Sequence, residues 1–230
     1  MRNIAIIPAR CGSKGLKDKN IKELCGKPLI AYSILAALAS EMFDTVMVST
    51  DSEKYANIAR AYGAEVPFLR SGRTASDTAS SWDVVEEVLL NYSNLGMNFD
   101  TFMLLQPTSP LRTSGNILEA YRELTEKEAD SIVSLCEVDH SPALSNILPA
   151  DLSLDGFIRK DINGRRRQDL PVYYRFNGAI YLSKVAFFMQ NHDIYRKGCF
   201  AYVMDKMDSI DIDDEFDFIM AEAVIRMKGR

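Results

Sequence analysis

The sequence is poor in the residues from which disulfide frameworks, zinc centres and histidine-based active sites are built. Its 230 residues include four cysteines and two histidines. The cysteines are scattered without C-x-x-C spacing, which argues against a zinc site and against a disulfide framework. His140 and His192 both stand in polar stretches, where surface or structural roles are expected. We therefore expect a protein of a reducing cytoplasm whose chemistry does not rest on a histidine base.

Long apolar runs and a positive net charge are also missing. No apolar run reaches the ~18 residues that a membrane-spanning helix needs. The chain enters a strand-like run at once, without the basic segment and long apolar stretch of a signal peptide. Lys and Arg total 27 against 32 Asp and Glu, for a net charge of −5. We expect neither a nucleic-acid nor a membrane partner, because no global positive field exists to hold one.

The chain does contain enough apolar material for one core. It is 47% hydrophobic and 26% charged, which at this length predicts a single domain over residues 1–230. Strand-like runs alternate with helix-like segments, as in an α/β fold. The expected strands cover residues 4–7, 44–50, 66–69, 102–106, 131–138, 177–182 and 199–204.

The segments between these runs predict helices. Residues 28–39 are apolar on nearly every side, so this helix should be buried. A second helix begins at Asp51 and stops at Gly63, and a third follows Ser81, which can cap it. Trp82, at the start of that helix, is expected to pack rather than to bind a ligand. A fourth helix passes through Ile117, Tyr121 and Leu124. A final amphipathic helix is marked by the apolar residues Phe216, Ile219, Met220, Ala223 and Met227.

Residues 140–175 interrupt the alternation of strands and helices. The segment contains three prolines and several polar turns, with weak strand signals over residues 152–158. It also carries the run Arg165 to Arg167. For Arg165 and Arg166, a solvated surface is the expected role. We predict an irregular excursion from the domain.

The first strand leads into a loop with the composition of a phosphate site. Residues 4–7 are apolar without alternation, as in a parallel strand buried on both faces. Gly12 and Gly15 allow the backbone amides to approach an anion. The Walker and dinucleotide-binding glycine patterns are both absent here. A basic surface loop is the alternative, but the cations and hydrogen-bonding residues favour a triphosphate; they are Arg10, Ser13, Lys14, Lys17, Lys19 and Asn20.

A pair of carboxylates lies near the other end of the chain. Asp211 and Asp213 alternate with Ile210 and Ile212, so an extended backbone would place both carboxylates on one face and the isoleucines on the other. Two such oxygen ligands suit a Mg²⁺ ion that bridges nucleotide phosphates. The neighbouring Asp214 and Glu215 are better explained as helix-capping residues.

Six ordered segments together resemble the CMP-sialic acid synthetase family. They read IPARCGSKGLKDKN, RTASDTASS, LLQPTSPLR, RQDLP, RFNGAIY and DSIDIDDE. The resemblance implies a three-layer α/β sandwich around a mostly parallel sheet, of the Rossmann-like nucleotide-diphospho-sugar transferase type. It also implies transfer of CMP from CTP to the anomeric hydroxyl of a nine-carbon acidic sugar, with release of pyrophosphate, and a homodimer in which residues 140–175 reach towards the partner's site.

The resemblance also assigns roles to individual residues. It implies that CTP phosphates are held by Arg10, Ser13, Lys14, Lys19 and Asn20, and that cytosine and ribose are surrounded by Arg70, Ala79 and Ser81. It places Gln106 between nucleotide and sugar, and it assigns the acidic sugar to Arg167, Arg175, Asn177 and Tyr181. Asp211 and Asp213 are the implied Mg²⁺ ligands, and Arg10, Lys19 and Asp211 are the expected catalytic residues.

The identity of the sugar remains open between N-acetylneuraminate and legionaminate. Many family members carry a lysine where this chain reads His140-Ser-Pro-Ala-Leu-Ser145, without a cation. A CMP-Kdo synthetase is one alternative, although GLKDKN and FNGAIY favour the nine-carbon branch. A non-catalytic nucleotide-binding module is another, and the retained Asp211, Asp213, Arg10 and Lys19 argue against it.

Overall fold

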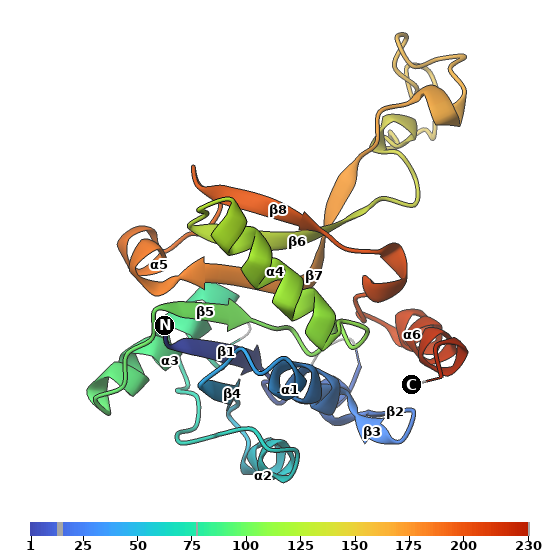
Figure 1. Cartoon of the computed structure of the whole chain (residues 1–230). Coiled ribbons are helices and arrows are strands. Elements are labelled where there is room, and N and C mark those ends of the chain that lie inside the picture. Colours follow the sequence, from blue (N-terminus) through green and yellow to red (C-terminus); the bar gives the residue numbers. More distant parts are fainter. Residues whose placement is uncertain (13–15, 77, 230) are drawn as a thin grey trace.

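A six-stranded mixed sheet forms the centre of the molecule, in the strand order β4-β1-β5-β7-β6-β8 (Figure 1). The computed structural model describes residues 1–12, 16–76 and 78–229, apart from the side chain of Arg167. Strand β1 runs parallel to β4 and β5, and β6 runs parallel to β8, whereas β7 is antiparallel to both of its neighbours. The expected mostly parallel sheet is confirmed. The strands are β1 (Asn3–Pro8), β4 (Thr45–Ser49), β5 (Thr101–Leu104), β6 (Ser131–Glu137), β7 (Tyr174–Lys184) and β8 (Cys199–Val203).

The alternation of side chains along β1 explains why helices cover both faces of the sheet. Ala5 and Ile7 pack into one apolar cluster, whereas Ile4 and Ile6 pack into another on the opposite face. All four are fully buried, and each isoleucine contributes roughly 1.5–3 kcal/mol. The first cluster is completed by α1 (Leu29–Ala39), α2 (Glu53–Ala61) and α4 (Ser114–Glu126), and the second by α3 (Ser81–Asn94) and α5 (Val185–Asn191).

A third apolar cluster joins segments that lie far apart in the sequence. Helix α6 (Glu215–Met227) packs Phe218, Ala221, Val224 and Ile225 against Leu24, Leu29, Leu111 and Ile212. Leu24 belongs to a small hairpin of β2 (Glu23–Leu24) and β3 (Lys27–Pro28). The cluster therefore fixes the loop after β1 and the Asp211 segment next to each other.

The predicted final helix forms as α6, but the apolar residues that marked it do not face the core. They lie on the solvent side, where Phe216 is 69% exposed and Met227 is 67% exposed. The helix carries two apolar stripes, and periodicity alone does not distinguish them. The capping box between Asp214 and Asp217 fixes the start of the helix, and contacts with Leu24 and Leu111 select the buried stripe.

The strand predicted at residues 66–69 does not form, and an isolated bridge between Met47 and Glu65 lies just before it. The weak strand signals at residues 152–158 correspond to turns and irregular backbone, as expected of the predicted excursion. The segment between β6 and β7 projects from the body as an irregular arm (Figure 1). Short 3-10 turns lie in the arm at Pro142–Leu144 and Arg167–Asp169, and outside it at Lys19–Ile21 and Lys206–Asp208. No helix within the described ranges is both long and apolar enough to cross a bilayer.

Helix α3 is capped one residue earlier than the sequence predicted. The Ser80 hydroxyl accepts a hydrogen bond from the Asp83 amide at 3.1 Å, and the Asp83 carboxylate accepts one from the Ser80 amide at 2.8 Å. Ser81, the expected cap, is the first helical residue. Ser and Asp three residues apart form the reciprocal box that satisfies two amides at a helix start.

Removal of this cap should destabilise the protein. Ser80→Ala is expected to lower the free energy of unfolding by about 1 kcal/mol, because the orphaned amide of Asp83 loses its acceptor. Urea denaturation without ligand measures the loss, and Ser81→Ala is the matched control. A loss as large in Ser81→Ala as in Ser80→Ala would contradict the assignment of the cap.

Candidate active site

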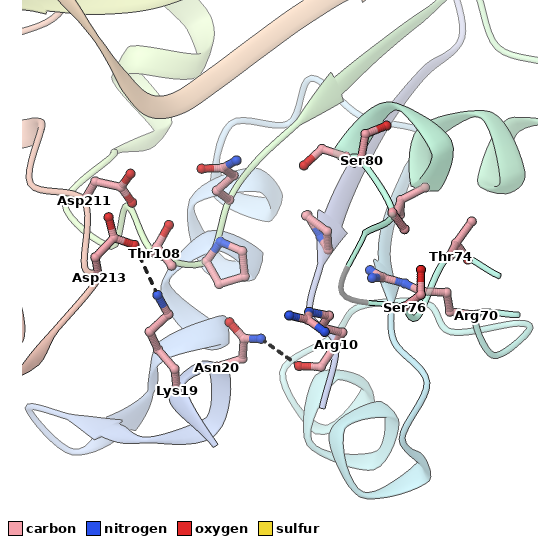
Figure 2. Close-up of a pocket in the computed structure, with 16 residues that line it drawn as sticks. Arg10, Lys19, Asn20, Arg70, Thr74, Ser76, Ser80, Thr108, Asp211 and Asp213 are labelled. Carbon is pink, nitrogen blue, oxygen red and sulfur yellow. Dashed lines mark hydrogen bonds and ion pairs between the residues drawn. The ribbon is translucent and has the colours of Figure 1, made fainter. Parts of the chain in front are cut away.

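The carboxyl ends of β1 and β5 open into a cavity of about 360 Å³ (Figure 2). This is the edge of an open α/β sheet where ligands bind. Four segments contribute to its wall: the loop after β1, the stretch that leads into α3, the exit of β5 and the strand-like segment before α6. The lining residues are Pro8, Arg10, Lys19, Asn20, Arg70, Thr74, Ser76, Ala79, Ser80, Ser81, Val84, Gln106, Pro107, Thr108, Asp211 and Asp213.

Most residues predicted to contact the nucleotide line this one cavity. They are Arg10, Lys19, Asn20, Arg70, Ala79, Ser81 and Gln106. Ser13 and Lys14, also predicted, lie outside the described residues. The sequence analysis missed Thr74, Ser76, Ser80 and Thr108. Each of the four lies within RTASDTASS or QPTSP. Their position in those motifs could have identified them as cavity residues.

The loop after β1 is shaped by contacts from the protein side. Asn20 is 6% exposed, and its Nδ2 donates to the Arg10 carbonyl at 3.1 Å. Asp18 has a left-handed backbone with φ 54°, and its carboxylate accepts a hydrogen bond from the Tyr55 hydroxyl at 3.0 Å. The Cys11 amide donates to Asp51 at 2.7 Å. Asn20 therefore holds the backbone that carries Arg10.

Arg70 brings a buried cation to the wall of the cavity. It is 8% exposed, and its guanidinium donates to Ser49 Oγ at 3.1 Å and to the Ser49 carbonyl at 2.7 Å. Burial lowers the pKa of Arg70 to about 10, so the group stays charged at neutral pH. These acceptors are neutral oxygens, and Asp51 and Glu87 act on the guanidinium only through their charge. Arg70 therefore brings a cation that lines the cavity.

Asp211 has a carboxylate oxygen that the protein leaves unsatisfied. Its Oδ1 is buried and has no hydrogen-bond partner among the described residues. Burial raises the pKa of the carboxyl, as does the neighbouring Asp213, while a hydrogen bond from Thr108 and the charges of Lys19 and Arg175 lower it. The backbone is anchored one residue on, where the Ile212 amide donates to the Thr108 carbonyl at 2.8 Å. Ile212 is fully buried, as expected of an anchor.

Lys19 connects the first loop to this acidic segment. Its Nζ donates to the Ile212 carbonyl at 2.7 Å and lies 3.5 Å from Asp213 Oδ1 (Figure 2). The Asp213 side chain is 83% exposed, so the ion pair itself is weak. The contact nevertheless places a cation between the phosphate loop and the carboxylate pair.

The donor set fits a divalent cation that also binds a ligand. A buried carboxylate oxygen without a donor is satisfied by a metal ion, and Mg²⁺ prefers one or two carboxylates together with substrate phosphates. In the described part of the chain no group of three or more His, Cys, Asp or Glu side chains could hold a metal alone. Asp211 and Asp213 would therefore hold the ion together with the ligand's own oxygens.

Gly178 leaves room for the side chains of both Asp211 and Gln106. A Cβ atom at this position would lie 2.9 Å from Asp211 Oδ2 and 2.9 Å from Gln106 Oε1, and the backbone is left-handed with φ +73°. Only glycine adopts this left-handed backbone without strain and also has no Cβ to clash with the two oxygens. The two side chains thus converge over β7 because residue 178 is a glycine.

The structure separates the residues predicted to bind the sugar. Gln106 lines the cavity, and Arg175 lines a neighbouring hollow of about 380 Å³ that shares Asp211 and Asp213 with it. Tyr181 is half-buried, its ring centroid 5.8 Å from that of Trp82, which packs as predicted. Burial raises the pKa of Tyr181 to about 12. Arg167 sits on the projecting arm, and its side chain lies outside the described residues.

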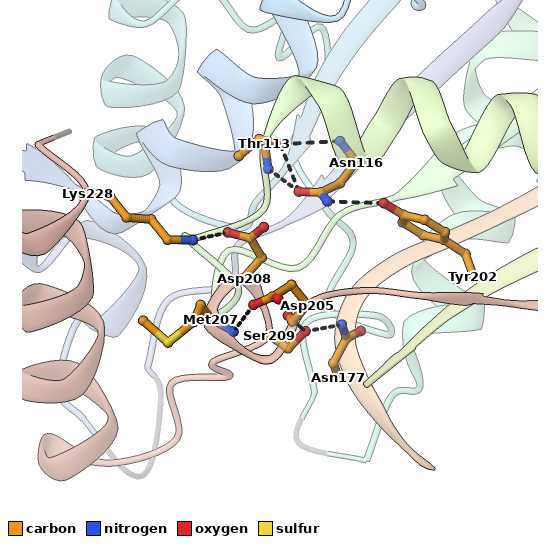
Figure 3. A network of polar contacts seen from close by, with 9 residues as sticks. All are labelled: Thr113, Asn116, Asn177, Tyr202, Asp205, Met207, Asp208, Ser209 and Lys228. Atoms are coloured by element: carbon orange, nitrogen blue, oxygen red, sulfur yellow. Dashed lines mark hydrogen bonds and ion pairs between the residues drawn. The ribbon is translucent and has the colours of Figure 1, made fainter. Parts of the chain in front are cut away.

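The prediction that Asn177 binds the sugar is corrected. Its side chain is fully buried, and its amide already has partners. Nδ2 donates to Ser209 Oγ at 2.9 Å (Figure 3), and Oδ1 accepts from Ser134 Oγ at 2.6 Å. Lys228 holds the same region through a 2.5 Å contact with Asp208. Asn177 therefore supports the segment before Asp211 instead of facing the cavity, and its polarity alone gave no warning of this burial.

The raised pKa of Asp211 predicts that the site costs stability. The folded state binds the Asp211 proton more tightly than the unfolded chain, whose value is 3.8. The ionised carboxylate therefore destabilises the fold above the raised pKa, and this penalty fades as the pH falls. Without metal or nucleotide, Asp211→Asn should raise the urea midpoint at pH 7, and the gain should shrink towards pH ~4.

Asp213→Asn is the matched control for this prediction, because its side chain is mostly in water and the midpoint should change little. A lower midpoint for Asp211→Asn at pH 7, or a gain that grows in acid, would show that burial does not strain this carboxylate.

Comparison with known proteins identifies the family of the chain. The profile of the cytidylyltransferase family matches residues 4–218. The N-acylneuraminate cytidylyltransferase of Escherichia coli O18:K1:H7 is 40% identical over 228 residues, which cover 99% of this chain and 53% of that protein. The CMP-N,N'-diacetyllegionaminic acid synthase of Legionella pneumophila is 35% identical over 234 residues, which cover 99% and 97%.

A solved structure of a CMP:2-keto-3-deoxy-manno-octonic acid synthetase complexed with CTP shares the fold. It aligns with a TM-score of 0.72 at 17% identity, over 99% of this chain and 100% of that one. The chain spans about half the length of the Escherichia coli relative and nearly all of the Legionella relative. From the profile match and these identities, the chain belongs to the cytidylyltransferase family, as its motifs indicated.

Proposed function

We propose that the chain transfers CMP from CTP to the anomeric hydroxyl of a nine-carbon acidic sugar, N-acetylneuraminate or legionaminate, and releases pyrophosphate. The observation that carries the proposal is the meeting of the cationic loop after β1 and the Asp211–Asp213 pair in one cavity. Relatives at 35–40% identity are named for transfer of this kind. Positioning and charge neutralisation supply most of the catalysis in phosphoryl-group chemistry.

Each group of residues that lines the cavity would have its own role in such a transfer. Arg10 and Lys19 would bind the β- and γ-phosphates and receive the charge of the leaving pyrophosphate. Arg70, Ala79 and Ser81 would surround the nucleoside, and Gln106 would stand between nucleotide and acceptor. Asp211 and Asp213 would hold Mg²⁺, which supplies charge neutralisation at the α-phosphate.

The reaction balances without a further reactant. The anomeric hydroxyl releases its proton to solvent as its oxygen forms a bond to the α-phosphorus. The bond from that phosphorus to the β-phosphate oxygen breaks, and pyrophosphate leaves towards Arg10 and Lys19. The acceptor hydroxyl must lie in line with the leaving group, on the Gln106 side of the cavity. An acidic sugar must approach an anionic nucleotide, so the site also needs a cation that binds the sugar. Arg167 and Arg175 are the candidates.

Other reactions remain as outcomes of the test. A CMP-Kdo synthetase shares the fold, and a non-catalytic nucleotide-binding module would keep the cavity without turnover. The unsatisfied Oδ1 of Asp211 favours a metal-dependent enzyme over that module, because a pure sensor gains nothing from a strained carboxylate. We also propose a cytoplasmic location, which the four free cysteines support.

A pyrophosphate-release assay tests the proposed function. CTP with Mg²⁺ and a panel of acidic sugars should give turnover with N-acetylneuraminate or a legionaminate, and little with Kdo. UTP and ATP should be poor donors, and excess chelator should abolish the rate. Equal turnover with all three nucleotides, or full activity in chelator, would reject the proposal.

The role of Arg167 is testable against its neighbour. If Arg167 binds the sugar carboxylate, from its own chain or from a partner's arm, Arg167→Ala should raise KM for the sugar by about tenfold or more and leave KM for CTP nearly unchanged. Arg165→Ala is the matched control, since a solvated arginine contributes little. Equal behaviour of the two variants would transfer the role to Arg175.

The arm offers apolar surface that supports a homodimer. Ile147 is 90% exposed, and Leu148, Leu152 and Leu154 are each more than half exposed. Such side chains on a projecting segment are usually covered by a partner. We expect a dimeric mass by light scattering, lost in Ile147→Glu and kept in the control Phe216→Glu, an exposed site on α6. A monomeric wild type would refute the dimer.

A further inference from the structure

Arg112, the last residue of the motif QPTSPLR, has no role in the function proposed above. It is 3% exposed. Its Nη1 donates to the Ala179 carbonyl at 2.8 Å and to the Gln106 carbonyl at 3.3 Å, and its Nη2 donates to Ser33 Oγ at 2.5 Å. Its Nε has no hydrogen-bond partner among the described residues. No carboxylate is among these contacts.

The guanidinium of Arg112 lies where the backbone pairing between β5 and β7 stops. Strands β5 and β7 pair antiparallel as far as Leu104 and Tyr181. Continued by two residues, the same register sets Gln106 opposite Ala179. There the strands no longer pair, and the guanidinium instead donates to both carbonyls. Arg112 therefore bridges a split between β5 and β7, next to Gly178, which the side chains of Gln106 and Asp211 both approach.

Ser33 extends the bridge to α1. Its hydroxyl donates to the Gln106 carbonyl at 3.2 Å and accepts from Arg112 Nη2. The Gln106 carbonyl thus accepts from three donors outside the sheet: Arg112, Ser33 and the Ser109 amide at 3.3 Å. These contacts fix the backbone from which the Gln106 side chain enters the cavity.

Stability alone does not explain a cation in this place. A charge buried without a counter-charge is costly, and an apolar side chain of similar volume is often neutral or more stable. Burial lowers the pKa of Arg112 to about 9, which reflects that cost, while the group remains charged at neutral pH. Residues that cost stability without a structural gain tend to serve the site.

We propose that Arg112 is a positioning residue that holds β5 and β7 apart at the width at which Gln106 and Asp211 converge over Gly178. The proposal rests on the function proposed above, because Gln106 then stands between nucleotide and acceptor. It assigns Arg112 to the acceptor side of the reaction: the contacts that hold the nucleotide, from Arg10, Lys19 and Arg70, do not pass through it.

Kinetics and binding measured side by side test the proposal. In Arg112→Met, kcat should fall by about 10²-fold, since a displacement near 1 Å has that effect. The Kd for CTP, read from the fluorescence of Trp82, the single tryptophan, should change by less than about threefold. Arg112→Lys should recover part of the rate, because an ammonium can donate to both carbonyls but loses the planar fork that also reaches Ser33.

Tyr121→Phe serves as the structural control. It removes a buried 3.0 Å hydrogen bond to Thr101 at the far end of β5, so it should lower the urea midpoint and leave kcat unchanged. If Arg112→Met keeps kcat within about twofold of wild type, or if its kcat and CTP affinity fall together, the proposal is overturned. Should Arg112→Met fail to fold, Ser33→Ala takes its place, with kcat expected to fall about three- to tenfold and an unchanged kcat counting against the proposal.

A crystal structure of Arg112→Met separates this proposal from the proposed function. The Gln106 carbonyl should move towards Ala179, and a Gln106 that superimposes on wild type would overturn the role of Arg112 whether or not the enzyme is active. A wild-type protein that turns over no acidic sugar would instead reject the proposed function and leave this structural comparison valid.

Discussion

Two side chains from distant parts of the chain, Gln106 and Asp211, can both approach the backbone of β7 because residue 178 is a glycine. Strand β7 lies between β5 and β6 and runs antiparallel to both. A side chain at 178 would displace one or both groups, and the left-handed φ would strain it as well. The rest of the site is arranged around Gly178. The acidic segment just before α6 supplies Asp211, and the loop after β1 reaches that segment through Lys19.

Near Gly178 the protein contains buried charges that lower its stability. Arg70 and Arg112 are buried on neutral acceptors, and Asp211 has a buried oxygen without a donor. Each charge is costly in the absence of ligand. For Arg70 and Asp211, which line the cavity, the proposed polyanion and cation would offset that cost. The apolar clusters on the two faces of β1 and around α6 supply the stability that offsets this cost.

Local patterns in the sequence predicted much of this arrangement. The run at residues 4–7 predicted a buried strand, which forms as β1. The cations after it predicted a phosphate-binding loop, and two of them, Arg10 and Lys19, line the cavity. Features that depend on contacts between distant segments left no local signal in the sequence. Helix α6 carries two apolar stripes, and only its contacts with Leu24 and Leu111 decide which one is buried. Asn177 is a polar residue inside a motif, yet Ser134 and Ser209 occupy its amide. The split between β5 and β7 depends on Arg112, which pairing patterns do not reveal.

The central claim is that one cavity holds CTP and a divalent ion between the loop after β1 and the Asp211–Asp213 pair. A crystal structure with CTP and Mn²⁺ in place of Mg²⁺ tests it most directly. The account predicts an anomalous peak beside Asp211 Oδ1 that also touches the phosphates, with Arg10 and Lys19 on the phosphate oxygens and the base near Ala79. A nucleotide bound elsewhere, or a metal peak away from Asp211, would contradict it.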